Sequence, residues 1–434
     1  MAEEHTPLLP DVRVISRLTR RWDLLIMLSV LGLLHNIVWN TWGPLAQTTS
    51  KLYGWDQSTI AIFANTSSIM FVIMFIPSAF MIKKSLKTAL LVASGAMALG
   101  TTLRAAFLND PEGNPGQFTI FCHICAVLNG ISTPLLGCGT MLLAFLWFPQ
   151  DELSTALTIS QIFYNLGPGL PFLMAKQMVQ PVDNATDIPS NVDLNNDMQW
   201  YLYSQAIPSV LFFIFIVVYF PSGPSRPTRS NLPDKATKFM SEIKSLAVKK
   251  TSWFIAIGSA IPQGIMRAWL AMMVFDLQQV CFGAECITQG WINTLAIFAT
   301  ISSTIAGVAA VRIIHISNRN LKITIGILYM FATLVFIYLT LVSLGIVHSA
   351  TVVKAHISIL FLTVTGYSLI TSSLPLTLKL AMNTMSPASE VTVACWLNFW
   401  LNIISIVFLS MFSISAIGSS WLNYILPVSS PAGQ

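Results

Sequence analysis

Eleven stretches of apolar residues, each long enough to cross a lipid bilayer, dominate this chain of 434 residues. About twenty apolar residues in a helix cover the roughly 30 Å hydrocarbon core of a bilayer. Only 9% of the residues are charged and the mean hydropathy is +0.69, whereas about 25% are charged in a soluble domain. The sequence therefore predicts an all-α polytopic membrane protein. The expected spans are 22–46, 59–82, 86–108, 118–147, 153–179, 199–220, 251–277, 289–312, 321–346, 350–379 and 390–417.

The placement of basic residues predicts the orientation in the membrane. With the N-terminus in the cytosol, 18 of the 23 lysines and arginines lie on the cytosolic side, seven of them between Arg226 and Lys250. Cytosolic loops carry such an excess. A glycosylation sequon at Asn184 then lies outside the cytosol, where glycosylation occurs. We read the basic residues as topology signals, and we expect the lipid bilayer rather than nucleic acid as a partner.

The order of the spans suggests two helical bundles. Residues 22–220 would form an N-terminal six-helix bundle and residues 251–434 a C-terminal bundle, preceded by a cytosolic tail, 1–21. Large secondary transporters have two such halves around a central site. The segment from Trp421 is too short to cross a bilayer, so we expect five full spans and a truncated sixth in the second bundle, that is, a truncated twelfth helix.

The basic linker, 221–250, contains one further predicted helix. Phe239, Ile243 and Leu246 are spaced by four and three residues. This spacing places the three apolar side chains on one helical face and predicts a short amphipathic helix lying on the membrane surface.

The six cysteines are too few for a disulfide framework. Cys281 and Cys286 share a short loop, in which they either pair or remain free. Residues 122–125 read Cys-His-Ile-Cys, but this run lies in an apolar span without acidic residues, which favours packing over metal ligation. No metal and no cofactor is expected.

One face of the first span combines an imidazole with two indole rings. His35, Trp39 and Trp42 follow the spacing of neighbours on a helix. Such a face suits a water-filled cavity that binds a small organic ring or amine. The alternative is packing inside the bundle around a hydrogen-bonded histidine.

Polar residues in the seventh and eleventh spans also need a partner. Arg267 lies near the middle of its span, where arginine costs about 3 kcal/mol on insertion scales. We expect it to face a cavity, either as a group that attracts anions or in an ion pair with a carboxylate such as Asp276. Asn398 and Asn402 share a face, where they bind either a ligand or a neighbouring helix.

The fifth span is interrupted in its middle. Residues 165–171 contain two prolines and two glycines, which break the hydrogen bonding of a helix. Such a break is tolerated only against protein or water, and in transporters it marks a moving or binding element. A static kink is the alternative.

Several short motifs match a known family. They are residues 38–44 (VWNTWGP), 147–149 (WFP) and 260–264 (AIPQG), and Pro387 with Glu390. The chain resembles the feline leukaemia virus subgroup C receptor family of major facilitator transporters, and most of all its lysosomal disrupted-in-renal-carcinoma branch. The resemblance implies the major facilitator fold with twelve helices. It also implies transport of small organic solutes such as choline, ethanolamine, vitamin B6-like compounds or haem.

The resemblance also implies residue roles. Trp39 and Asn398 match a cavity tryptophan and a cavity asparagine of the family, while Thr133 replaces a glutamine. Arg267 replaces a tyrosine that helps to enclose quaternary ammonium groups. Two like charges 4 Å apart repel by about 4 kcal/mol at an effective dielectric constant near 20, so Arg267 disfavours choline.

The first residues carry an expected sorting signal. Glu4, Leu8 and Leu9 form the acid-x-x-x-Leu-Leu pattern that clathrin adaptors read on lysosomal proteins. Such a signal is an address and not a membrane anchor. The tail therefore predicts a multi-pass lysosomal-membrane protein with a cytosolic N-terminus, with the plasma membrane as the alternative.

We predict a lysosomal-membrane secondary transporter for a small organic solute, either vitamin B6-like or an amine metabolite. Proton coupling is an option, because a histidine with a reference pKa near 6.5, such as His35, is about 97% protonated at pH 5 and about a quarter at pH 7. The alternatives are a plasma-membrane choline, ethanolamine or haem transporter and a non-transporting regulatory or binding protein. No nucleotide-binding loop or nucleophile–base spacing occurs, so no enzyme is expected.

Overall fold

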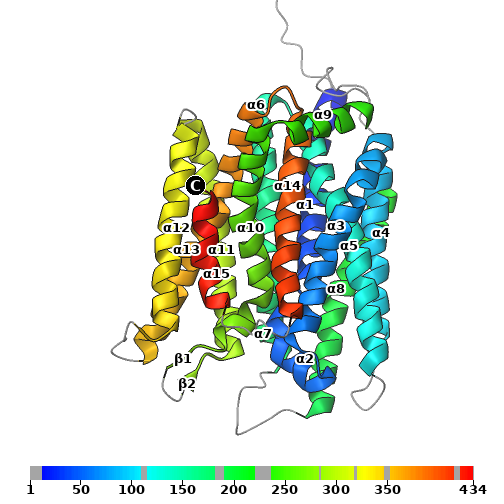
Figure 1. Ribbon diagram of the computed structural model, residues 1–434. Coiled ribbons are helices and arrows are strands. Elements are labelled where there is room, and N and C mark those ends of the chain that lie inside the picture. Colours follow the sequence, from blue (N-terminus) through cyan, green and yellow to red (C-terminus); the bar gives the residue numbers. More distant parts are fainter. Residues whose placement is uncertain are drawn as a thin grey trace, which may run out of the picture.

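Long helices run side by side through the whole molecule (Figure 1). Ten of the helices in the described part of the chain are long and apolar enough to cross a membrane, which confirms the predicted helical membrane protein. The computed structural model describes residues 12–108, 115–180, 190–219, 236–282, 285–316, 320–346, 352–414 and 421–433.

The helices form two bundles. The helices of the first are α1 (Val12–Trp39), α3 (Gln57–Lys84), α4 (Leu86–Ala106), α5 (Pro115–Trp147), α6 (Gln150–Leu166), α7 (Leu170–Met178) and α8 (Asn191–Tyr219), with η1 (Gly43–Leu45) and α2 (Ala46–Tyr53) between α1 and α3. Those of the second are α10 (Lys250–Leu277), α11 (Gln289–Ile316), α12 (Leu321–Ser343), α13 (Val352–Thr384), α14 (Glu390–Ser410) and α15 (Leu422–Ser429), with η3 (Met411–Ser413) and η5 (Ser430–Gly433).

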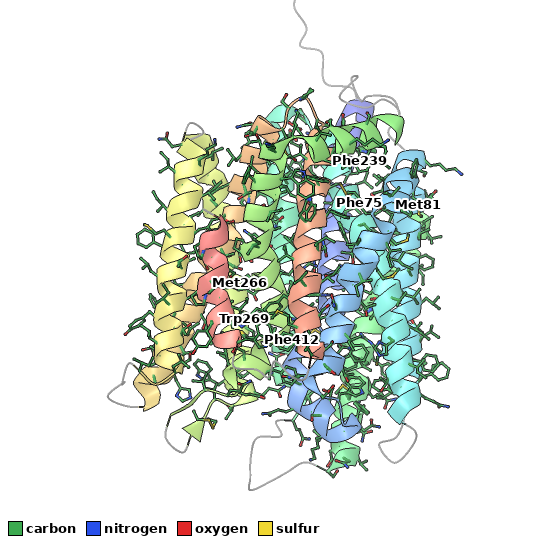
Figure 2. All side chains as sticks on the ribbon, in the orientation of Figure 1. Phe75, Met81, Phe239, Met266, Trp269 and Phe412 are labelled. Carbon is green, nitrogen blue, oxygen red and sulfur yellow. A yellow bond between two sulfur atoms is a disulfide. The ribbon has the colours of Figure 1, made fainter. Side chains whose placement is uncertain are left out.

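The two bundles meet along two seams. Helix α14 packs against α3, and α11 packs against α6 and α7. In the second bundle, α10 packs against α13 and α14, and its buried Trp269 and Met266 contribute to the core there (Figure 2). The last helix, α15, is eight residues long and packs against α12 and α10.

The two ends of the bundles differ. At one end, which we name the linker face, α9 (Ala236–Val248) crosses the helix ends (Figure 1, top). At the other end, which we name the hairpin face, β1 (Cys281–Phe282) pairs antiparallel with β2 (Glu285–Cys286). Cys281 and Cys286 form a disulfide across this two-stranded hairpin, so the pairing left open by the sequence is present.

The linker helix packs against protein. Leu246 is fully buried, and the ring of Phe239 lies 6.0 Å from that of Phe75 on α3 (Figure 2). The spacing of apolar residues predicted the helix and its apolar face. This face packs against the bundles and not against lipid. The bundles offer an apolar surface at the linker face, and α9 covers it.

The fifth membrane-crossing segment is interrupted at the predicted place. Helix α6 ends at Leu166 and α7 begins at Leu170. The Nδ2 atom of Asn40 on α1 donates a hydrogen bond to the carbonyl of Pro168 at 2.8 Å, within the interruption. A Cβ atom on Gly169 would lie 2.6 Å from Cβ of Thr300, so glycine is required where the chain passes α11. The break therefore lets α1 and α11 approach the same point.

The outward surface of the bundles is apolar. Val218 is 80% exposed, Phe254 78% and Phe361 68%, and many other large apolar side chains on the outer faces are exposed as well. Water does not favour such a surface, whereas the hydrocarbon region of a bilayer does. The molecule is therefore built to be surrounded by lipid.

Candidate functional site

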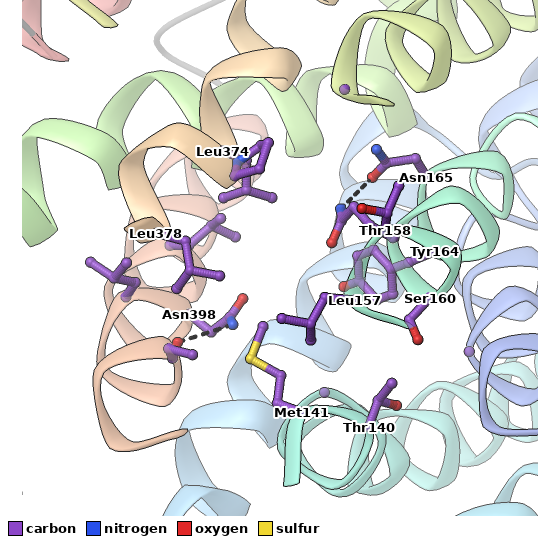
Figure 3. Close-up of a pocket in the computed structure, with 18 of the residues that line it drawn as sticks. Thr140, Met141, Leu157, Thr158, Ser160, Tyr164, Asn165, Leu374, Leu378 and Asn398 are labelled. Atoms are coloured by element: carbon purple, nitrogen blue, oxygen red, sulfur yellow. Dashed lines mark hydrogen bonds between the residues drawn. The ribbon is translucent and has the colours of Figure 1, made fainter. Parts of the chain in front are cut away.

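A cavity of about 600 Å³ lies between the two bundles and reaches toward the linker face. Residues of α1, α5 and α6 line it from the first bundle, and residues of α10, α11, α13 and α14 line it from the second (Figure 3). The volume falls within the range of pockets that bind small organic molecules. Both halves of the protein thus contribute to a single site.

Much of the wall of this cavity is apolar. Met141 and Leu157 from the first bundle lie across the cavity from Leu374 and Leu378 on α13 (Figure 3). These side chains give a surface that suits the hydrocarbon part of a solute.

Amide side chains supply polar groups from both bundles. On α6, the Nε2 atom of Gln161 donates to Oδ1 of Asn165 at 2.8 Å. On α14, Asn398 donates to the carbonyl of Ala394, and Asn402 donates to the carbonyl of Asn398. Among the described residues, these bonds leave the Asn165 N–H groups and the Asn398 and Asn402 side-chain oxygens without partners. A solute can therefore accept hydrogen bonds on one side and donate them on the other.

Arg267 contributes a positive charge from α10. Its guanidinium carbon lies 5.0 Å from the ring centre of Trp39 and 5.6 Å from that of Tyr164. Cation–π contacts of this kind hold a guanidinium without cancelling its charge. Arg267 makes neither a hydrogen bond nor an ion pair with any described residue, and it lines the cavity.

The suggested ion pair between Arg267 and Asp276 is absent from the structure. Asp276 accepts a hydrogen bond from Nε1 of Trp269 at 2.6 Å instead. Nine residues separate Arg267 from Asp276 on one helix, a rise of roughly 13 Å. The carboxylate is therefore too far along α10 to neutralise the guanidinium.

The predicted imidazole–indole face of α1 points mainly into the first bundle. His35 is 1% exposed, and its ring nitrogens lie 3.0 Å from Oδ1 of Asn129 and 3.3 Å from Oγ1 of Thr133. Nε1 of Trp39 donates to the carbonyl of Ala64 at 3.1 Å. His35 and Trp39 are outside the cavity lining, because α3 and α5 cover this face. Trp39 still contacts the site through Arg267.

Trp42 lies farther toward the hairpin face and is also outside the lining. Its ring packs 4.9 Å from that of Trp55, and the guanidinium of Arg104 lies 5.3 Å from its centre. Arg104 is 2% exposed and donates to Oε1 of Gln205 at 2.7 Å. Trp42 therefore belongs to a packed aromatic cluster in the first bundle.

Four of the predicted residues line the cavity: Thr133, Arg267, Asn398 and Asn402. Sequence reasoning missed the lining residues on α6, among them Gln161, Tyr164 and Asn165. A signal was present, because Gln161 and Asn165 are four residues apart in a membrane span and Asn165 begins the interrupted motif. Glu4, Leu8, Leu9 and Asn184 lie outside the described residues.

The cavity is closed toward the hairpin face by contacts between the bundles. A Cβ atom on Gly43 would lie 2.6 Å from the carbonyl oxygen of Ala271, so η1 and α10 touch through backbone. Within the described ranges, hydrogen bonds also join the bundles, among them Gln289 to the carbonyl of Pro44, Lys176 to Thr294 at 2.7 Å, and Asn65 to Ser410 at 3.1 Å.

A cavity between two bundles, open toward one membrane face and closed toward the other, is the arrangement that secondary transporters have. The family model described as Major Facilitator Superfamily matches residues 24–409. The chain belongs to this superfamily.

Curated relatives confirm the family resemblance seen in the sequence motifs. "Solute carrier family 49 member 4 homolog" of Xenopus laevis is 26% identical, over 94% of this chain and 88% of its own length. "Choline/ethanolamine transporter FLVCR2" of Homo sapiens is 22% identical, over 92% of this chain and 72% of its own length. Both are members of the feline leukaemia virus subgroup C receptor family of transporters.

Solved structures share the fold. A D-xylose–proton symporter superimposes with a TM-score of 0.68, at 12% identity, over 94% of this chain and 95% of that one. An inward-facing bacterial homologue of the human lysosomal transporter Spinster superimposes with a TM-score of 0.62, also at 12% identity, over 95% and 92% of the two chains. Structural similarity at such low sequence identity shows a shared fold and says nothing about the substrate.

Proposed function

We propose that this chain is a lysosomal-membrane carrier for a small organic solute, which binds in the cavity between the bundles. The observation that supports this most directly is the cavity itself, with apolar walls and with polar groups from both halves that have no partner in the described part of the chain. A solute bound to both bundles favours a change in their relative position, which is what alternating access requires.

The proposed orientation has the N-terminus and the linker face in the cytosol. Basic residues gather at this end of the helices, as cytosolic loops require. The cavity would then be open to the cytosol in the described state. The acidic dileucine pattern of Glu4, Leu8 and Leu9 supports the lysosomal location.

Proton coupling through His35 is part of the proposal. His35 is buried, but the hydroxyl of Thr133 lies against its ring and also lines the cavity. Thr133 therefore gives the imidazole a hydrogen-bonded route to the solute site.

A choline or ethanolamine carrier of the plasma membrane is the second candidate. The printed names of several relatives support it, among them the human transporter cited above. The positive charge of Arg267 in the cavity opposes a cationic solute.

Redirecting the protein to the cell surface tests the proposed function. The variant Leu8→Ala/Leu9→Ala removes the apolar part of the sorting pattern, so we expect it at the plasma membrane while the unmodified chain stays in lysosomes. Uptake of a panel of labelled small solutes is then measured at pH 5 and pH 7, and we expect flux that depends on pH. Pro10→Ala is the matched tail variant and should remain lysosomal. Surface residence of the unmodified chain, or no flux at either pH, would contradict the proposal.

A further inference from the structure

We propose that the transported solute is a small organic anion and that its carboxylate or phosphate group binds Arg267. This inference rests on the proposed function, because it assigns a chemical class to the solute of the same cavity. It is carried by three observations: the guanidinium without a partner among the described residues, its distance from the acidic residue of the lining, and the amide groups that line the same cavity.

The first observation is that the donors of Arg267 are unused. A guanidinium presents five N–H donors in a planar fork, which matches the two oxygens of a carboxylate or phosphate. None of these donors bonds to a described residue, although the side chain lines the cavity. The rings of Trp39 and Tyr164, at 5.0 and 5.6 Å, hold the group in place. The protein thus orients this cation and leaves its counter-ion to be supplied.

The second observation concerns depth in the membrane. Glu390 is the acidic residue among those that line the cavity, and it begins α14 near the linker face. Gly264 on α10 lies beside Leu401, since a Cβ atom on it would be 2.8 Å from the Leu401 carbonyl. Glu390 precedes Leu401 by eleven residues, a rise of roughly 16 Å, and Arg267 lies one helical turn deeper than Gly264. Glu390 therefore cannot neutralise Arg267.

The remaining charge of the lining adds to the positive potential. Lys379 on α13 also lines the cavity, so Arg267, Lys379 and Glu390 together give it a net charge of +1. A cleft with apolar walls and a net positive charge raises the local concentration of anions and lowers that of cations.

The third observation is the arrangement of the amides. Asn165 on α6 offers N–H donors, whereas Asn398 on α14 offers an oxygen acceptor across the cavity (Figure 3). Asn402, also on α14, lines the cavity and offers a second oxygen. An anion that also carries hydroxyl or N–H groups satisfies both sides at once. The predicted class is therefore a small hydroxylated or N–H-bearing carboxylate or phosphate ester.

Matched acid and neutral probes test the assignment. Thermal stabilisation of the purified full chain is measured with nicotinate, nicotinamide and 1-methylnicotinamide, which share a ring but differ in charge. The pairs 3-hydroxybutyrate with its amide, and glycerol 3-phosphate with glycerol, extend the test to other frameworks. We expect each bound acid to bind at least tenfold more tightly than its neutral or cationic counterpart. The reason is that an ionised group strengthens the hydrogen bonds from Arg267.

Variants of the arginine identify the group responsible. We expect Arg267→Gln to weaken acid binding by about 10- to 100-fold and to abolish the preference for acids. Arg267→Lys keeps the charge without the planar fork, so it should retain the preference at lower affinity. Lys322→Gln removes the same charge from an exposed position on α12 and should change nothing. If Arg267→Gln does not yield folded protein, the anion assignment is tested with Arg267→Lys, which should bind acids at lower affinity but still prefer them.

The outcomes separate this inference from the proposed function. The anion assignment is overturned if no acid binds, if neutral or cationic probes bind as well as acids, or if the preference survives in Arg267→Gln. Uptake of the same labelled probes into proteoliposomes is measured in parallel. Acid binding without flux of any probe would overturn transport and leave the anion assignment standing. Flux of neutral or cationic probes that is the same in the wild type and in Arg267→Gln would overturn the anion assignment and leave transport standing.

Discussion

At the scale of single residues, the sequence identifies polar side chains in the membrane better than it identifies what they contact. The spacing of His35 and Trp39 places them on one face of α1, as the structure has them. Whether that face meets the cavity depends on how α3 and α5 pack against α1, which local spacing does not encode. Arg267 and Asn402 reach the cavity because their helices, α10 and α14, each turn one side to it.

Replacing His35 tests its buried contacts. We expect His35→Ala to destabilise the protein by roughly 1–3 kcal/mol, because the Asn129 and Thr133 side chains lose a buried hydrogen-bonding partner. His35→Gln keeps a donor and an acceptor and should lose less. The thermal midpoint of the purified protein measures both. His123→Ala serves as the control, since this histidine is only half-buried on α5; an equal loss there would contradict the argument.

At the scale of elements, the pattern of apolar residues predicts where the helices are. It does not predict which other helices each of them packs against. The prolines and glycines of residues 165–171 predict the interruption between α6 and α7, because they remove backbone hydrogen bonds locally. The position of α9 is different. Glu242 of this helix accepts hydrogen bonds from Ser389 and Thr392, at 2.8 and 2.6 Å, about 150 residues later in the chain. No local pattern reveals such a contact.

The carboxylate of Glu242 should hold the start of α14. It accepts bonds from the hydroxyl and the backbone N–H of Ser389, the N-cap residue of that helix. We expect Glu242→Ala to speed amide hydrogen exchange in the first turn of α14 several-fold, whereas Glu242→Gln, which keeps an acceptor, should have a smaller effect. Lys244→Ala changes an exposed residue of the same helix and provides the control. Unchanged exchange in Glu242→Ala would refute the role.

At the scale of the whole molecule, hydropathy predicts the membrane-crossing segments, and the two-bundle fold follows from their order and from the family resemblance. Hydropathy and the order of the spans do not predict which conformation of the transport cycle the structure has. One sequence serves every conformation of the transport cycle, so nothing in it says which face is closed. Closure at the hairpin face involves contacts between bundles, such as the hydrogen bond of Lys176 with Thr294, whose partners lie 118 residues apart in the chain.

Gly43 offers a way to disturb that closure. A Cβ atom there would lie 2.6 Å from the backbone oxygen of Ala271, so Gly43→Ala should disfavour the state closed at the hairpin face. We expect a cysteine introduced at Thr300 to react several-fold faster with a maleimide added from that face, because the closed population falls. Gly290→Ala, where a Cβ atom would meet nothing within 4 Å, is the control. Equal labelling rates in both variants would contradict the gate.

The apolar exterior determines how the protein behaves outside a membrane. Side chains such as Val218 and Phe361 must be shielded by amphiphiles once the protein leaves its membrane. The purified protein is consequently a protein–detergent or protein–lipid particle. Its thermal midpoint depends on the surrounding alkyl chains as well as on the fold. A change of detergent or lipid therefore shifts the thermal midpoint even when the amino-acid sequence is unchanged.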